Sequence, residues 1–152
     1  MAIYVDADAC PVKAEIYRVA ERYQLKVFVV SNSYMNVPRD PRIELVVVAD
    51  SFDAADNWIA ERAGPGDIVV TADIPLAARC LAAGARVVGP TGKPFTEAGI
   101  GMALAMRDLS RHLRETGESK GYNASFAPQD RSRFLGELDR ILRRALKSAT
   151  PG

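Results

Sequence analysis

The sequence predicts an α/β protein with a mainly parallel sheet of four to five strands, helices on both faces, and additional C-terminal helices. Short apolar runs rich in Val and Ile alternate along the chain with segments of helical periodicity. Strands separated by helices imply a parallel sheet that is covered on both faces. At 152 residues, with 48% hydrophobic and 26% charged residues, the chain fits a single domain over 1–152 with its own core.

Local sequence signals justify each element in chain order. The predicted strands are Ile3–Val5, Lys26–Val30, Glu44–Val48, Ile68–Thr71 and Arg86–Val88. The predicted helices are Pro11–Tyr23, Asp53–Ala63, Ile74–Ala83, Gly99–Leu113 and 130–147. Pro11 opens the first helix, Gly64 follows the second, and Pro75 and Gly84 bracket the third. The polar, Gly- and Ser-containing span 115–128 predicts a mobile loop.

Composition excludes several classes of protein and site. No apolar run reaches membrane-spanning length, and the first residues lack a secretory signal pattern, so we expect a cytoplasmic protein. Cys10 and Cys80 form no metal-spaced pair, and we expect two reduced thiols that pack as small hydrophobic groups. His112 is the only histidine in the sequence, which excludes a multi-histidine metal site.

Charge is unevenly distributed along the chain. Residues 1–73 hold 12 acids and 7 bases (net −5), 74–106 hold 1 acid and 3 bases (net +2), and 107–152 hold 6 acids and 10 bases (net +4). This asymmetry suits a metal-binding pocket beside a surface that attracts polyanions, and it equally suits a solvated amphipathic tail. The candidate contacts for a nucleic-acid backbone are Arg111, Arg114, Arg131 and Arg133.

Aspartates follow three of the predicted strands. The first strand is followed by Asp6 and Asp8, the third by Asp50, Asp53 and Asp56, and the fourth by Asp73. The carboxyl ends of parallel strands lie at one edge, so these acids converge if the first, third and fourth strands are neighbours. Carboxylate ligands without Cys or His favour Mg²⁺ or Mn²⁺.

Helix capping is the competing explanation for these acids. Asp53, with Asp56 three residues later, is close to a capping box, and Asp73 precedes a helix as an N-cap. The joint placement after separate strands favours metal ligands for Asp6, Asp8 and Asp73.

Three segments carry a resemblance to a known family. They read VDADACPVK at 5–13, FDAADNWI at 52–59 and GDIVVTADIPLA at 66–77. Together with Asp130-Arg131 they make nearly the whole chain resemble the YaiI/YqxD family of uncharacterised bacterial proteins. That family is similar to PIN-like domains, which are metal-dependent nucleases with an acidic site on an α/β sheet. The resemblance implies that the first acidic motif is Asp6 and Asp8, the middle one Asp53 and Asp56, and the last one Asp73.

The leading hypothesis is metal-assisted hydrolysis of a phosphodiester, with RNA favoured over DNA as the partner and a homodimer left open. The metal ligands are Asp6, Asp8, Asp53 and Asp73, the catalytic acids are Asp6, Asp8, Asp56 and Asp73, and the substrate contacts are Lys13, Thr71 and Arg131. Within this set Asp8 or Asp56 positions the attacking water.

Three alternatives remain open from the sequence. A haloacid-dehalogenase-like phosphatase would use Asp6 as the nucleophile and Asp8 as the acid/base, although Cys10 stands where such sites carry Thr or Val. A receiver module would accept a phosphoryl group on Asp50. A non-catalytic nucleic-acid-binding module would use the basic C-terminal part.

Overall fold

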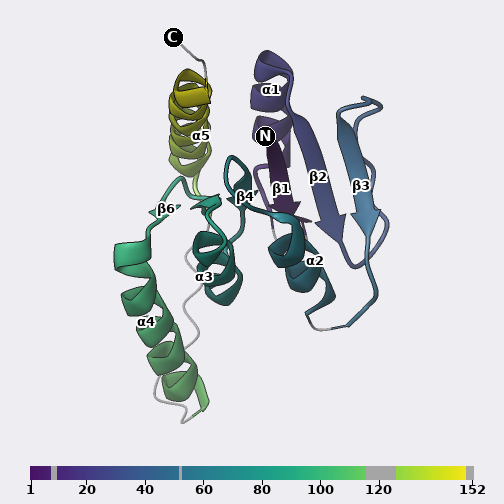
Figure 1. Cartoon of the computed structure of the whole chain (residues 1–152). Helices are drawn as coiled ribbons and strands as arrows, with labels where there is room; N and C mark the ends of the chain where they lie inside the picture. The colour runs from purple at the N-terminus through teal and green to yellow at the C-terminus, as the bar shows by residue number, and fades with distance from the viewer. Residues whose placement is uncertain (8–9, 52, 116–125, 150–152) are drawn as a thin grey trace.

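A computed structural model describes residues 1–7, 10–51, 53–115 and 126–149. Six strands form one sheet in the order β3-β2-β1-β4-β5-β6 (Figure 1). The strands are β1 (Ala2–Asp6), β2 (Lys26–Ser31), β3 (Ile43–Val47), β4 (Ile68–Val70), β5 (Arg86–Val88) and β6 (Pro94–Phe95). The helices are α1 (Lys13–Tyr23), α2 (Ala54–Arg62), α3 (Ile74–Ala82), α4 (Glu97–Glu115) and α5 (Pro128–Ala149).

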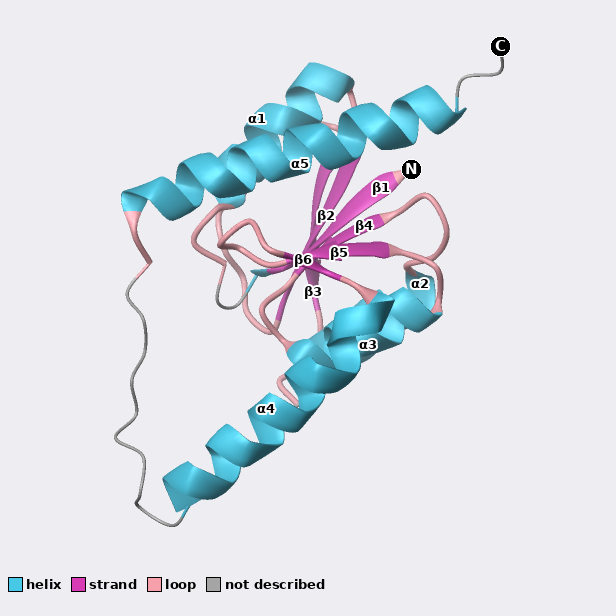
Figure 2. Ribbon diagram, turned by 90° about the vertical axis from the view of Figure 1, so that its left-hand side faces the viewer, coloured by secondary structure: helices cyan, strands magenta, loops and turns pink. Residues whose placement is uncertain are grey.

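Helices cover both faces of the sheet, which confirms the predicted three-layer α/β class. α1 and α5 lie on one face, and α2, α3 and α4 lie on the other (Figure 2). Successive side chains of β1 point to opposite faces of the sheet. Ile3 and Val5 pack in the core beneath α1 and α5, and Tyr4 packs in the core beneath α2 and α3. Phe134 of α5 is fully buried in the first of these cores, so the C-terminal helix is part of the domain's main packing.

The sixth strand was not predicted. β6 pairs antiparallel with β5, through Val87 opposite Phe95 and Val88 opposite Pro94. Two residues carry no periodicity, and a leading proline argues against a strand, so the local pattern is silent here. The pairing depends on a turn in which Gly92 adopts φ +89 and Gly89 donates its N–H to the Lys93 carbonyl oxygen. The predicted loop at 115–128 lies mostly outside the described residues.

The chain leaves the two central strands in opposite directions. β1 runs into α1, which packs on the same face as α5, whereas β4 runs into α3 on the other face. β1 and β4 are parallel neighbours, with Val5 opposite Val70 at their carboxyl ends. In open α/β sheets, ligands bind where the connections that follow two adjacent parallel strands pass to opposite faces of the sheet. The carboxyl ends of β1 and β4 are therefore the first place to look for a site.

The prediction that both cysteines pack as small hydrophobic groups is confirmed. Cys10 and Cys80 are free thiols, and both are buried in the hydrophobic cores. Burial raises the pKa of each thiol, that of Cys80 to about 11. Trp58 packs against Tyr4 and Phe28, with ring centroids 6.0 and 5.7 Å away. No described helix has the length and apolar character needed to cross a membrane.

Candidate active site at the carboxyl ends of β1 and β4

A continuous set of hydrogen bonds joins the ends of β1 and β4. Thr71, only 2% exposed, donates its hydroxyl to Asp6 Oδ2 at 2.9 Å. The same hydroxyl oxygen accepts the backbone N–H of Asp73 at 2.9 Å, and Asp73 Oδ1 in turn accepts the N–H of Leu76 at 2.9 Å. Thr71 therefore holds the Asp6 carboxylate and the backbone of Asp73 in one arrangement.

The sequence offered two interpretations of Asp73, a helix cap and a metal ligand, and the structure shows the cap. Its side chain caps α3, as the capping interpretation predicted, and Pro75 lies in the first turn of that helix. The cap uses one carboxylate oxygen, and a carboxylate offers about four acceptor positions in all. Capping therefore orients Asp73 without excluding a further role at this edge.

Asp56 approaches the same edge from α2. This half-buried side chain has its pKa raised from 3.8 to about 6, first because burial disfavours the charged form and then because Asp73 and Asp6 are negatively charged nearby. Arg79 opposes the rise and Asp53 adds to it. The structure thus brings Asp6, Asp56 and Asp73 into one electrostatic neighbourhood.

We expected the acids after the third strand to meet those after the first and fourth strands, and the strand order corrects this expectation. β2 separates β3 from β1, so the end of β3 is not beside the ends of β1 and β4. Asp50 and Asp53 are exposed, and Asp53 makes no side-chain hydrogen bond at the N-terminus of α2. Asp53 is thus the N-cap residue of α2, as predicted, but it does not form the hydrogen bond of a capping box. Asp56, one turn further along α2, is the residue of that motif nearest the site. Asp8 lies outside the described residues.

The three predicted substrate contacts differ in their surroundings. Thr71 lies within the hydrogen-bond set described above. Lys13 Nζ donates to the carbonyl oxygens of Ala7 and Cys10, at 3.3 and 3.0 Å, and so ties the chain after β1 to the start of α1. Arg131 joins α5 to the first turns of α1, through the carbonyl oxygen of Pro11 at 2.7 Å and through Glu15 at 3.2 Å.

Of the three remaining arginine candidates, the structure describes the side chain of Arg133. Arg133 forms an ion pair with Asp130 of its own helix at 3.4 Å. The side chains of Arg111 and Arg114 lie outside the described part of the chain.

The donor chemistry of the site fits a hard divalent cation, although the described side chains do not complete a metal site. Asp6, Asp56 and Asp73 offer only carboxylate oxygens, the ligands that Mg²⁺ and Mn²⁺ prefer. Within the described ranges, no three His, Cys, Asp or Glu side chains are grouped closely enough to hold a metal ion.

Two residues near the site were missed by sequence reasoning. Arg79 of α3 donates to Asn57 Oδ1 of α2 at 2.8 Å, and its positive charge lowers the pKa of Asp56. This bond fastens α2 to α3 directly beside Asp56. Asn57 stands in the middle acidic motif and Arg79 one and a half turns after Asp73, but no spacing rule connects them, because they meet only through helix packing.

Comparison with known proteins shows the family of this chain. A family model described as uncharacterized BCR, YaiI/YqxD family, matches residues 4–144. The chain belongs to this family. A UPF0178 protein of Mesorhizobium japonicum is 73% identical over 99% of this chain and 97% of its own length. Family proteins of Rhizobium etli (68% identical, over 94% of this chain and 92% of the relative) and Agrobacterium fabrum (64%, over 95% of each) are also similar. No solved structure matches the chain.

Proposed function

We propose that this YaiI/YqxD-family protein is a metal-dependent nuclease that hydrolyses phosphodiester bonds, with RNA as the favoured substrate. The observation that carries the proposal is that Asp6, Thr71 and Asp73 meet at the carboxyl ends of β1 and β4. The chain passes from these two strands to opposite faces of the sheet. This is the ligand-binding position of open α/β sheets. Carboxylates held at that position suit a substrate whose phosphate oxygens need a cation between them and the protein.

Asp6 and Asp73 would hold Mg²⁺ or Mn²⁺, with Asp8 as the further ligand inferred from the sequence. When bound, the metal supplies charge neutralisation for the phosphate and lowers the pKa of an attacking water. Thr71 keeps the Asp6 carboxylate in one rotamer through its 2.9 Å hydrogen bond. Asp56 is the described carboxylate placed to orient a water, since it lies close enough to Asp6 and Asp73 to feel their charges.

The basic C-terminal part supports a polyanionic substrate, because residues 107–152 carry a net charge of +4. Arg131 borders the chain between β1 and α1 through its bond to the carbonyl oxygen of Pro11. Lys13 lies in the same region, on α1. Lys13 is the lysine or arginine nearest in the sequence to Asp6.

The experiment compares cleavage of labelled RNA and DNA by the wild type, Asp6→Asn and Asp50→Asn, each purified in parallel and assayed with Mn²⁺ and with chelator. Asp50 is exposed in the connection between β3 and α2, so its variant controls for the loss of one carboxylate. We expect Asp6→Asn to abolish cleavage and Asp50→Asn to retain it. Equal cleavage by the wild type and Asp6→Asn would identify a contaminating nuclease and overturn the proposal.

Two further outcomes would each replace the proposal with a specific alternative. Hydrolysis of a phosphomonoester with RNA left intact would favour the phosphatase, in which Asp6 is the nucleophile. RNA binding that persists in chelator, without cleavage under any condition, would favour a binding module.

A further inference from the structure

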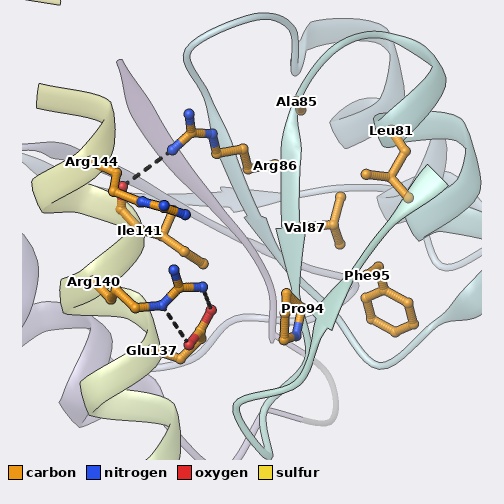
Figure 3. Close-up of a pocket in the computed structure, with 10 residues that line it drawn as sticks. All are labelled: Leu81, Ala85, Arg86, Val87, Pro94, Phe95, Glu137, Arg140, Ile141 and Arg144. Atoms are coloured by element: carbon orange, nitrogen blue, oxygen red, sulfur yellow. Dashed lines mark hydrogen bonds and ion pairs between the residues drawn. The ribbon is translucent and has the colours of Figure 1, made fainter. Parts of the chain in front are cut away.

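A cavity of about 560 Å³ opens at the far edge of the sheet, between the β5/β6 edge and α5. Figure 3 shows Arg86 of β5 and Arg140 and Arg144 of α5 on one side of it, with Leu81 and Phe95 on the other. Arg86 is the first residue of β5, whereas the candidate active site lies at the carboxyl ends of β1 and β4. The cavity is therefore distinct from the site proposed for phosphodiester hydrolysis.

Positive charge in this cavity exceeds the negative charge that faces it. Glu137 pairs with Arg140 through two hydrogen bonds and so neutralises one guanidinium. Arg86 donates to the carbonyl oxygen of Ile141 at 3.3 Å, which positions its guanidinium but leaves its charge uncompensated. Among the described residues, Arg144 has no hydrogen-bond or ion-pair partner. Two of the three arginine charges in the cavity thus lack a counterion in the described part of the chain.

Without a bound anion, the positive charges that face the cavity repel one another. Arg140 and Arg144 are four residues apart and lie on one face of the helix, where the uncompensated charge of Arg144 is repelled by the other guanidinium groups of the cavity. Arg86 adds a third guanidinium to the same cavity from the sheet. An anion bound between Arg86 and Arg144 would relieve this repulsion and would meet donors that can grip phosphate oxygens in pairs.

The rest of the cavity is apolar. Leu81 and Val87 contribute buried side chains, and Phe95 contributes a partly exposed aromatic ring. The volume lies within the range of small-molecule sites, roughly 300–1,000 Å³. A ligand of that size reaches both the arginines and the apolar wall, so a compact anion alone would leave the apolar part unused.

We propose that this cavity binds an organic phosphate that carries a flat ring, of the class of the nucleoside monophosphates. The phosphate contacts the guanidinium groups of Arg86 and Arg144. The ring lies against the apolar wall that includes Leu81 and Phe95, because aromatic side chains accept any base face. This binding needs no metal and no residue of the candidate active site.

Isothermal titration calorimetry in chelator, with adenosine monophosphate, adenosine and inorganic phosphate as separate probes, tests the proposal. The variants are Arg144→Gln and Arg86→Gln, each of which removes one charge from an exposed side chain. Arg143→Gln is the matched control, because Arg143 precedes Arg144 on the helix but pairs with Asp139 at 3.0 Å and does not line the cavity.

We expect adenosine monophosphate to bind more tightly than either fragment, and each cavity variant to weaken it by about tenfold or more. Arg143→Gln should leave the affinity within about twofold. Asp6→Asn should also bind adenosine monophosphate normally, which separates this result from the outcome of the cleavage assay.

The proposal is overturned by no saturable binding of adenosine monophosphate up to about 10 mM, a limit near 3 kcal/mol of affinity. It is also overturned by equal weakening in Arg143→Gln and Arg144→Gln, which would indicate a general charge effect. Equal affinity for inorganic phosphate would refute the role of the apolar wall, and equal affinity for adenosine would refute the role of the arginines.

Discussion

Removing the charge of Asp56 should stabilise the metal-free protein at neutral pH. In the folded state, burial and the charges of Asp73 and Asp6 raise the pKa of Asp56 from 3.8 to about 6. If the whole of this rise acted on stability, it would amount to about 3 kcal/mol. Because the side chain is only half-buried, solvent screening reduces the expected gain for Asp56→Asn to about 1 kcal/mol. That gain corresponds to a rise in Tm of about 2–4 °C for a domain of this size.

The pH dependence gives the prediction its sign. Because the folded-state pKa of Asp56 lies above the unfolded value, the folded protein holds more protons between pH 3.8 and about 6. The free energy of unfolding contributed by this group falls as the pH rises through that window. The penalty is fully present above pH 6 or so and absent below about pH 4, so the advantage of Asp56→Asn should disappear on acidification.

Urea denaturation followed by circular dichroism, in chelator at several pH values, measures this difference. Asp50→Asn is the control, since it removes an exposed carboxylate and should change the free energy of unfolding by less than about 0.5 kcal/mol. Asp56→Asn that is less stable than the wild type at pH 7 would refute the reasoning. The same would follow from an equal gain at pH 4 and pH 7.

Three other substitutions, two of them with a matched control substitution, test the structure around the site and the core. Thr71→Val should cost about 1–3 kcal/mol in chemical denaturation and reduce cleavage, because it removes the bonds to Asp6 and Asp73, whereas Thr71→Ser should retain both properties. Gly92→Ala should destabilise by about 2 kcal/mol, since φ is +89 and a Cβ would lie 2.8 Å from the Phe134 nitrogen. Gly136→Ala on α5 meets no atom within 4 Å and should raise Tm instead. Phe134→Ala should cost about 3–5 kcal/mol, and a loss below 1 kcal/mol would contradict the placement of α5 in the core.

Local pattern was sufficient for most of the secondary structure. Val and Ile runs identified β1, β2, β3, β4 and β5, and helical periodicity identified α1, α2, α3, α4 and α5. These features depend on burial that repeats every two or 3.6 residues, which a sequence records directly. β6 escaped because its two residues acquire strand geometry only by pairing with β5.

The candidate site was predicted in part for the same reason. Asp6 and Asp73 stand immediately after strands, and the parallel character of the sheet places both at one edge. The sequence named both Asp53 and Asp56, and which of the two lies nearer Asp6 and Asp73 depends on the position of β2 between β1 and β3 and on the packing of α2 beside α3.

The sequence by itself determined the α/β class, the family and the acidic motifs, since each depends on residues that are near one another in the chain. Only the tertiary structure decided which distant residues meet. Strand order placed Thr71 against Asp6, 65 positions away, and the docking of α5 on the sheet placed Arg86 beside Ile141, 55 positions away. Such contacts depend on how whole faces of the helices and the sheet pack together. The free energy of this packing is distributed over many core residues, so no single position in the sequence indicates it.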